Sequence, residues 1–324
     1  MTWRTNTSTS TAAVSVAAVP ASAIVLSVLI HTLWGGNVVA GKFGLEAFPP
    51  FWSACIRFLF GLATVWCWCL YTRRRLQPES HEWRPLLLIS VYFTVQIGLM
   101  NVGFDNTSGT NGAILISTNP LFAAMFAHFI IAGDHLSMKR VFGLLLAFAG
   151  VLLTLLVSGS QNAELSLFEQ MKTLSFGRLG DWLCLASACL LGFRLMASAR
   201  AMRKVDSYRL AFWQMMISVP AFALLGLLFE DISLQAVSLR AIAGLAYQGV
   251  VVAGIGFMVS LWLISRYRPS LMASFNFISP VSGVLLSVWL LNENFNPVLL
   301  LSVFLVAAGI VVLTVDKSTS ARSK

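Results

Sequence analysis

A chain of 324 residues that is 57% hydrophobic and 11% charged, with a mean hydropathy of +0.80, has too little polar surface to coat a water-soluble globule. These values indicate an integral membrane protein and exclude a large soluble catalytic domain. The formal net charge of +9 does not indicate nucleic-acid binding, because the basic residues are spread over separate loops rather than grouped on one face.

Ten apolar runs follow one another along the chain after a tail at residues 1–21, which is rich in Ser, Thr and Ala and is predicted to be disordered. The first run is longer than the apolar region of a cleaved signal peptide, so it is interpreted as a membrane helix. Each run is long enough to cross a bilayer. The sequence therefore predicts an all-α membrane protein with ten transmembrane helices at residues 22–40, 51–71, 85–104, 111–132, 140–157, 180–199, 208–229, 240–264, 270–291 and 297–315.

Basic residues predict the orientation of these helices, because Lys and Arg beside short loops resist translocation. Sixteen of them fall on one side of the predicted topology, and only Lys42, Lys172, Arg178 and Arg240 fall on the other. Both termini, including a short tail at residues 316–324, are therefore predicted to face the cytoplasm, with the chain in the cytoplasmic (inner) membrane. The longest connection, residues 158–179, becomes an extracytoplasmic linker between five helices and five.

The two five-helix halves, residues 22–157 and 180–315, resemble each other weakly but in the same order along the chain. Residues 118–136 resemble residues 278–295. The aligned pairs are Pro120 over Pro280, Asp134 over Glu293 after a one-residue slip, Ala149-Gly150 over Ala308-Gly309, and, at a shift of 157 positions, Gly35 over Gly192, Asn37 over Arg194 and Arg57 over Gln214.

A five-helix unit crosses the membrane an odd number of times, so its second copy enters from the opposite side. The halves are therefore predicted to be inverted repeats. Inverted repeats surround a midplane site in many secondary transporters, because two nearly equal halves rock to expose that site to either face. A duplicated structural bundle without transport is the alternative.

The first hairpin of the chain resembles that of a known family. Residues Leu33 to Phe58 read LWGGNVVAGKFGLEAFPPFWSACIRF, with a Trp-Gly pair, an Asn, two adjacent prolines and an Arg early in the second helix. With the Pro, acidic and Gly pattern that ends both halves, this stretch resembles the EamA-type branch of the drug/metabolite transporter superfamily. The resemblance implies a ten-helix inverted-repeat exporter of amino acids or related metabolites, with a cavity lined by helices 1, 3, 4, 6, 8 and 9. Where that family often has Gly-Glu after helix 4, this chain has Gly133-Asp134, which keeps the charge.

Charged residues inside the apolar runs are few. None of the 13 acidic residues lies deep in a predicted helix, which disfavours the export of organic cations, because a cation usually needs a buried carboxylate. Arg57 and Arg194 each lie about 9 Å inside a helix end at a rise of about 1.5 Å per residue. Either side chain can snorkel to the headgroups, or it can bind a substrate carboxylate bidentately in a cavity. We favour Arg194 for the second role, because its repeat partner Asn37 belongs to the helix 1 motif.

Uncharged polar side chains complete the predicted site, because amide and hydroxyl groups in lipid are costly and should point inward. Inward can also mean interhelical hydrogen bonding alone. The Gly35-Gly36 pair permits local unwinding or tight helix packing. The predicted substrate-binding residues are Trp34, Asn37, Tyr92, Gln96, Asn119, Arg194, Tyr247, Gln248, Asn276 and Ser279.

Two prolines and two histidines are further candidates. Pro120 and Pro280 lie inside predicted helices 4 and 9, where each removes a helical donor and bends its helix. We predict them to be hinges of a rocking carrier, with static kinks as the alternative. His31 and His128 lie in apolar runs and either carry a coupling proton or serve only in packing.

The sequence thus predicts a secondary transporter that exports amino acids or similar small metabolites by alternating access. It uses no ATP, since the sequence contains no Walker loop. A phosphorylated-metabolite or sugar-nucleotide exchanger ranks lower, because only two buried arginines are available to bind phosphates. An intramembrane enzyme is a remote alternative, because no nucleophile motif accompanies the histidines, and no enzyme activity is predicted.

The predicted partners are a small carboxylated molecule and the lipid bilayer, without nucleic acid. No cofactor or metal site is predicted, since the five cysteines lie in helices without zinc-ligand spacing. A stripe of small residues on helix 5, namely Gly143, Ala147 and Gly150, packs either within the chain or against a second subunit. The sequence therefore leaves open whether the protein forms a homodimer.

Overall fold

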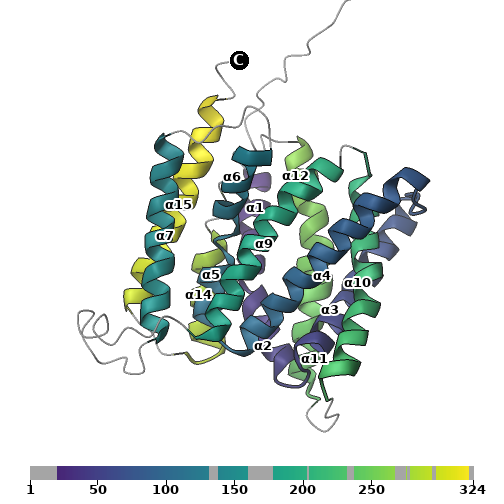
Figure 1. Cartoon of the computed structure of the whole chain (residues 1–324), viewed down its shortest axis with the longest axis horizontal. Coiled ribbons are helices and arrows are strands. Elements are labelled where there is room, and N and C mark those ends of the chain that lie inside the picture. Colours follow the sequence, from purple (N-terminus) through teal and green to yellow (C-terminus); the bar gives the residue numbers. More distant parts are fainter. Residues whose placement is uncertain are drawn as a thin grey trace, which may run out of the picture.

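The computed structural model describes residues 20–130, 138–159, 178–202, 204–231, 237–266, 275, 278–293 and 297–320. Within these residues the regular structure is helical and contains no strand (Figure 1). The helices are α1 (Ala21–Gly35), α2 (Asn37–Leu45), α3 (Pro50–Tyr71), the 3-10 turn η1 (Ser80–Glu82), α4 (Trp83–Asp105), α5 (Gly109–Ile116), α6 (Asn119–Ile130), α7 (Met138–Gly159), α9 (Leu179–Ala201), α10 (Ser207–Phe229), α11 (Leu239–Ala246), the π-helix η3 (Tyr247–Gly256), α12 (Phe257–Arg266), α14 (Ile278–Leu290) and α15 (Pro297–Ser320).

Most predicted spans appear as one helix, but the first, fourth and eighth are divided. The first breaks at Gly36 into α1 and α2, the fourth breaks before Pro120 into α5 and α6, and the eighth runs through the π-helix η3. In the ninth, α14 begins at Ile278, and α15 continues to Ser320, five residues past the predicted end of the tenth. The predicted tail up to residue 19, most of the linker (residues 160–177), Asp134 and Asn276 lie outside the described residues.

The surface of the bundle suits a bilayer. Six helical segments of the described chain are long and apolar enough to cross a membrane, and shorter apolar helices are present at Val141–Thr154, Ile278–Leu290 and Pro297–Val312. Large apolar side chains face outward: Leu227 is 72% exposed and Phe304 is 68% exposed. Such contiguous apolar surface is stable against lipid rather than water. The chain is therefore an all-α membrane protein, as predicted.

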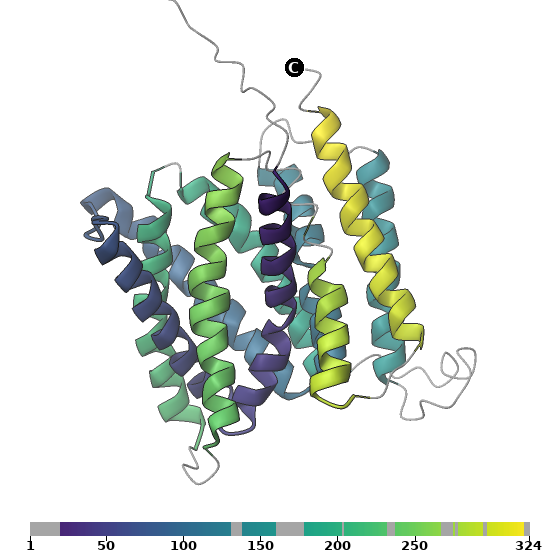
Figure 2. The same cartoon turned by 180° about the vertical axis from the view of Figure 1, so that it is seen from behind.

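Successive spans alternate in direction, so their connections gather on two faces. The first residue of α1 and the last residue of α15 lie at the same face, at the top of Figures 1 and 2. The connections that carry Arg73, Arg74, Arg75 and Lys204 lie at this face too, where the indole of Trp213 donates to the carbonyl of Leu76 over 2.8 Å. We call it the basic face, and the other end of the bundle the opposite face.

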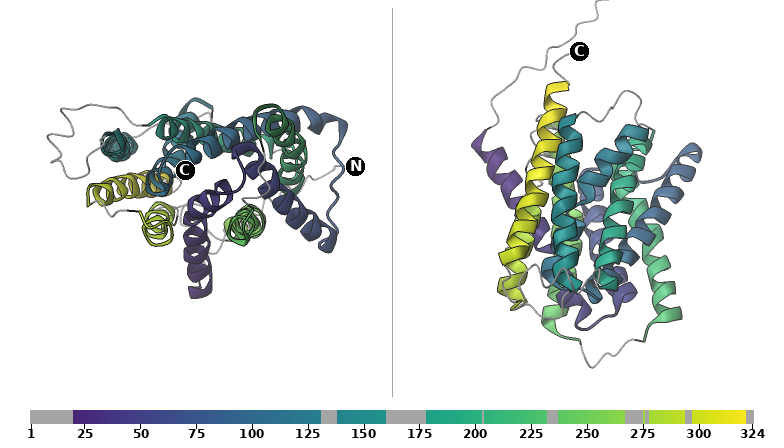
Figure 3. Two further views of the ribbon diagram at one scale, coloured as in Figure 1. Left: turned by 90° about the horizontal axis from the view of Figure 1, so that it is seen from below. Right: turned by 60° about the vertical axis from the view of Figure 1, so that its left-hand side comes forward.

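Helix packing shows that the two halves are related by an approximate twofold rotation. α7 packs on α15, as Figures 1 and 3 show, α3 packs on α10, and α5 packs on α14; each is a pair of equivalent spans. Each of the other large contacts between the halves recurs between the equivalent spans. The contact of α4 with α9 recurs as α11 with α2, that of α6 with α9 as α14 with α1, and that of α10 with α4 as α3 with η3. Because each half crosses the membrane five times, this axis lies in the membrane plane, and the halves are inverted repeats.

Two aligned glycines show the same symmetry at atomic detail. A Cβ atom added to Gly35 would lie 2.7 Å from both Ser279 O and Gly283 N of α14. A Cβ atom added to Gly192 would lie 2.9 Å from Asn119 O and 2.7 Å from Ala123 N of α6. The contacted residues are themselves equivalent at a shift of 160 positions, which also aligns Pro120 with Pro280. Glycine at both positions lets the two backbones touch.

The small-residue stripe on α7 packs within the chain. A Cβ atom on Gly150 would lie 2.7 Å from Ser302 O of α15, and one on Gly309 would lie 2.5 Å from Gly143 O of α7. Ala147, between them, is fully buried. The stripe therefore packs within the chain, against α15. It gives no reason to infer a homodimer.

Candidate functional site

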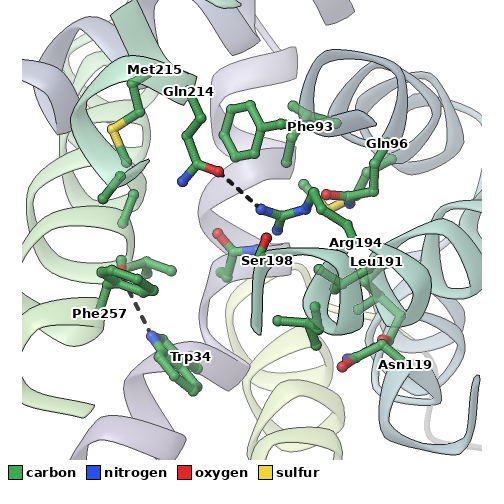
Figure 4. Close-up of a pocket in the computed structure, with 18 of the residues that line it drawn as sticks. Trp34, Phe93, Gln96, Asn119, Leu191, Arg194, Ser198, Gln214, Met215 and Phe257 are labelled. Atoms are coloured by element: carbon green, nitrogen blue, oxygen red, sulfur yellow. Dashed lines mark hydrogen bonds between the residues drawn. The ribbon is translucent and has the colours of Figure 1, made fainter. Parts of the chain in front are cut away.

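A cavity of about 410 Å³ lies between the two halves (Figure 4). Its lining comes from the spans 1, 3, 4, 6, 8 and 9 that the resemblance implied, and also from α3 and α10, the second and seventh spans. The volume lies near the lower end of the range for ligand pockets, about 300–1,000 Å³. The cavity therefore fits a metabolite of modest size.

Most of the predicted site residues line this cavity. They are Trp34, Asn37, Gln96, Asn119, Arg194, Gln248 and Ser279. Tyr92 and Tyr247 are not among its lining residues, and Asn276 lies outside the described residues. Pro120 lines the cavity, whereas Pro280 is buried in α14. Polar lining residues that the sequence analysis did not select are Arg57, Ser117, Ser198, Ser207 and Gln214.

The break at Gly36 is stabilised by side chains of the eighth span. The hydroxyl of Tyr247 donates to Leu33 O over 2.7 Å, in the last turn of α1, where a helix leaves carbonyls without donors. The amide of Gln248 donates to the backbone oxygen of Asn37 over 2.8 Å and to its side-chain oxygen over 3.0 Å. Tyr247 therefore supports the broken backbone, while Gln248 and Asn37 present an amide pair to the cavity.

The break before Pro120 has its own substitute donor. Proline lacks an N–H, so the carbonyl of Ile116 has no helical partner. The side-chain amide of Asn119 donates to that carbonyl over 2.9 Å. The equivalent hydroxyl, that of Ser279, instead donates to His31 O over 3.1 Å and so ties α14 to α1.

Gln96, a lining residue of the cavity, has a side-chain acceptor without a donor among the described residues. Its amide nitrogen donates to Ser187 Oγ over 2.9 Å, and that hydroxyl donates in turn to Gln96 O. Its side-chain oxygen is buried, and no donor reaches it from the described residues. Tyr92, one turn earlier on α4, packs edge-to-face on Phe193, with 5.2 Å between the ring centroids. Tyr92 and Gln96, four residues apart on one face of α4, thus separate into a packing residue and a cavity residue.

Arg194 lies at the centre of the cavity (Figure 4). Its Nη1 donates to the side-chain oxygen of Gln214 over 3.2 Å, and its Cζ lies 5.0 Å from the centroid of the Phe93 ring. The Nε atom is buried, and no described residue accepts a hydrogen bond from it. The guanidinium is thus positioned by an amide and an aromatic ring rather than by a carboxylate.

Arg57 also lines the cavity and is 4% exposed, so its side chain is enclosed by protein. Its Cζ lies 4.4 Å from the centroid of the Phe58 ring. Its Nε and Nη1 atoms are buried, and neither has a hydrogen-bond acceptor among the described residues. The repeat alignment carried the signal for this residue, because it places Arg57 over Gln214, the partner of Arg194.

The cavity reaches toward the basic face and closes before the opposite face. Its lining extends to Ser207 and to Met202, which is 39% exposed, beside the connection between α9 and α10. On the other side of Asn37 the helices are in close contact: a Cβ atom on Gly41 would lie 2.9 Å from Gln248 Nε2, and one on Gly44 would lie 2.4 Å from Leu245 Cδ2. Access is therefore from the basic face.

A polar network holds the opposite face together. The ammonium of Lys42 in α2 donates to the carbonyl of Thr107, and the Thr107 hydroxyl donates to the carboxylate of Asp181 at the start of α9. The carboxylate of Glu293, just after α14, accepts from the backbone N–H groups of Gly109 and Thr110 at the start of α5. This network joins four segments from both halves, and carboxylates at helix N-termini stabilise the helices they cap.

His31 serves in packing. Its Nδ1 donates to Ser27 O over 2.7 Å, and its ring contacts Trp34 edge-to-face with 5.2 Å between the ring centroids. It is buried and is not among the cavity residues. The side chain of His128 lies outside the described residues.

Comparison with known proteins gives the same picture from sequence and from fold. The model of the EamA-like transporter family matches residues 21–156 and again residues 178–315. The chain is 20% identical over 289 residues to a Bacillus subtilis protein named "Uncharacterized transporter YoaV", covering 89% of this chain and 95% of the relative. It is 23% identical over 297 residues to an Escherichia coli protein named "Probable amino-acid metabolite efflux pump", covering 88% and 92%.

A solved crystal structure aligns with a TM-score of 0.65 at 20% sequence identity, covering 93% of this chain and 99% of its own. At that identity the alignment shows that the fold is shared. The two matches of the family model coincide with the two halves that the helix contacts relate.

Proposed function

We propose a function on the premise that this chain belongs to the EamA-like transporter family, whose model matches both of its halves. Membership makes it a multi-pass membrane protein of a transporter family, with a small-molecule substrate. We infer further that it is a secondary transporter that exports small carboxylated metabolites, amino acids among them, by alternating access across the cytoplasmic membrane. No covalent step is part of this function, and we propose no enzyme activity.

The observation that carries the proposal is the chemistry of the cavity. Arg194 and Arg57 are the only charged residues among its described lining residues. A guanidinium presents a planar fork of N–H donors that matches a carboxylate. A cation as substrate would instead require a buried carboxylate. Gln96 adds an acceptor suited to a hydroxyl or ammonium group of the same substrate.

Direction follows from the loops. The cavity reaches the basic face, and loops rich in Lys and Arg remain cytoplasmic. The substrate would therefore enter from the cytoplasm, as export requires, and both termini would be cytoplasmic. The resemblance implies, and the E. coli relative's name "Probable amino-acid metabolite efflux pump" supports, amino acids as one class of cargo.

We propose that the seven predicted lining residues and Arg57 bind substrate, and that Gln214 holds Arg194 in position. Tyr247 is proposed to support the broken backbone of the first span, and Pro120 to break that of the fourth, where a moving half could bend. Tyr92 has no proposed contact with substrate, because its ring packs on Phe193.

Efflux from proteoliposomes tests the proposal. Vesicles that contain the purified protein would be loaded with a panel of labelled amino acids and small carboxylic acids, and release would be followed at two external pH values. We expect protein-dependent release of at least one carboxylated compound and its loss in Arg194→Ala. Arg240→Ala, at an arginine whose side chain is 53% exposed near the opposite face, is the matched control and should transport normally. Unchanged efflux from Arg194→Ala would remove Arg194 from the site.

A further inference from the structure

The two cavity arginines come from different halves at different positions. Asn37 and Arg194 are equivalent positions, and so are Arg57 and Gln214. At these two pairs of positions each half therefore supplies one amide and one guanidinium: Asn37 and Arg57 from the first, Gln214 and Arg194 from the second. All four side chains line the same cavity.

Both guanidinium groups lack a counter-charge among the described residues. Arg57 has two buried nitrogens without an acceptor and is stacked only on Phe58. Arg194 has one such nitrogen, and its hydrogen bond goes to a neutral amide. Arginine stays protonated at physiological pH, and an unpaired charge removed from water is costly. The cavity therefore holds two positive charges that its described lining does not balance.

Charge balance then discriminates among carboxylated substrates. A zwitterion has no net charge, so both positive charges would remain uncompensated, and its ammonium group would lie close to two cations. A monoanion compensates one of the two. A dianion compensates both, and it can bridge the halves because Arg57 and Arg194 belong to different halves.

We propose that the preferred substrate is a small organic dianion, a dicarboxylate or a phosphate monoester, held between Arg57 and Arg194. This inference rests on the proposed function and adds the net charge of the substrate; a dicarboxylate falls within the proposed carboxylated class, whereas a phosphate monoester would extend it. The aromatic side chains of Trp34, Phe93 and Phe257 line the same cavity and pack against the apolar part of the substrate. Gln214 is a positioning residue, because it holds Arg194 rather than replacing its charge.

Binding of size-matched probes tests this proposal. Thermal unfolding of the purified full-length protein in detergent would be measured with succinate, butyrate and 4-aminobutyrate, which share a four-carbon chain and differ in charge, and with glycerol 3-phosphate. We expect succinate, glycerol 3-phosphate or both to raise the Tm at concentrations at which butyrate and 4-aminobutyrate do not. If only one dianion raises the Tm, the site prefers the headgroup of that dianion, carboxylate or phosphate. If both raise it, the site recognises the double negative charge rather than the headgroup.

Substitutions of the two arginines test whether each of them binds one negative charge of the dianion. Arg57→Gln and Arg194→Gln should each weaken dianion binding by about tenfold to a hundredfold, the effect of removing one charged hydrogen-bonding partner. Arg240→Gln, which removes an arginine outside the cavity, should not. Without ligand, Arg57→Gln should unfold at a higher temperature than the wild type, because it removes an unpaired buried charge. Arg57→Met, which also removes the charge and keeps a long side chain, gives the same test if the Gln variant does not fold.

The outcomes separate this inference from the proposed function. If butyrate or 4-aminobutyrate binds as tightly as the dianions, or if dianion binding survives in Arg57→Gln, the dianion proposal is wrong while carboxylate binding at Arg194 stands. If none of the four probes binds and the vesicles release no carboxylated compound, both proposals are wrong.

Discussion

The first hairpin, α1 to α3, and its counterpart 157 positions later, α9 and α10, pack differently around the cavity. Both halves contribute lining residues at four equivalent pairs, but at six others only the second half does. The shared pairs are Trp34 and Leu191, Asn37 and Arg194, Arg57 and Gln214, and Phe58 and Met215; the unshared pairs are Val38 and Leu195, Gly41 and Ser198, Leu45 and Met202, Pro50 and Ser207, Ser53 and Leu210, and Ala54 and Ala211.

This difference has a physical meaning. The shared pairs lie near the middle of the membrane-spanning helices, whereas the unshared pairs lie toward the connections between these helices. The second hairpin is therefore open to the cavity along its length, and the first is packed closed: Val38 is 2% exposed, but its equivalent Leu195 is 40% exposed. Two halves with one fold and two packings are what a carrier needs, because exchanging the packings would open the cavity to the opposite face.

The largest effect on stability and transport is expected at the two equivalent glycine contacts between the halves. Gly35→Ala and Gly192→Ala each place a Cβ atom 2.7 Å from backbone atoms of α14 or α6. Both should lose transport and about 1–3 kcal/mol of stability through overpacking, measured as Tm and as monodisperse protein in detergent. Gly61→Ala is the control, since its nearest contact would be an ordinary 3.4 Å. Loss in only one of the two glycine variants would show that the contacts are not equivalent.

The next largest effect is expected where the halves differ. In a background without reactive cysteines, Leu195→Cys should react with a water-soluble maleimide at least about tenfold faster than Val38→Cys, since a minor conformation is populated at about 10% or less. Labelling rates in proteoliposomes measure this directly. Equal rates would mean that the first hairpin opens as readily as the second, and the asymmetry would then not describe the protein in a membrane.

A smaller effect is expected from loosening the closed end. Lys42→Met removes the ammonium that donates to Thr107 O, so the opposite face should open more often and the labelling of Val38→Cys should rise by up to about tenfold. Lys139→Met, at an exposed lysine in the first turn of α7, is the control and should leave the rate unchanged. A rate that stays the same in Lys42→Met would show that close packing around Gly41 and Gly44 seals this end without the network.

Much of the fold could be predicted because it depends on local chemistry. The apolar runs predicted the spans, and the order of Gly and Pro predicted the repeat. The aligned Gly35 and Gly192 make matched backbone contacts, and the residues they contact are equivalent at the same shift that aligns Pro120 with Pro280. The all-α membrane fold and the family are confirmed. The cytoplasmic location of the termini and the exact repeat boundaries stay predictions.

The site was less predictable, because it depends on which way each side chain turns and on how the halves close. Tyr247 and Gln248 are neighbours, but on the π-helix η3 only Gln248 reaches the cavity. Tyr92 shares a helix face with Gln96, but its ring packs on Phe193. The sequence treats Arg57 and Arg194 as either snorkelling or cavity residues, and only tertiary packing encloses both.

The smallest effect concerns how the equivalent helices α3 and α10 begin. Asp206 caps α10 by accepting from Tyr208 N, but its equivalent, Pro49, cannot cap α3. The carboxylate of Glu230, at the end of α10, instead accepts from Phe51 N over 2.8 Å and from Trp52 N over 3.1 Å. Helix α10 is thus capped by a side chain next to its own first residue, whereas α3 is capped by a carboxylate from the other half.

Burial raises the pKa of Glu230 above its ordinary value of 4.5, although the two backbone N–H groups partly oppose this shift. A raised folded-state pKa contributes stability that is present below the unfolded-state pKa and is lost as the pH rises through the folded-state value. Stability should therefore fall as the pH rises from about 4.5, and Glu230→Gln, which keeps an oxygen acceptor, should flatten that slope in Tm measurements. Glu230→Ala should flatten the slope too and, because it also loses the cap, should be about 1 kcal/mol less stable than Glu230→Gln at every pH. If Glu230→Gln keeps the wild-type slope, the pH dependence belongs to another group.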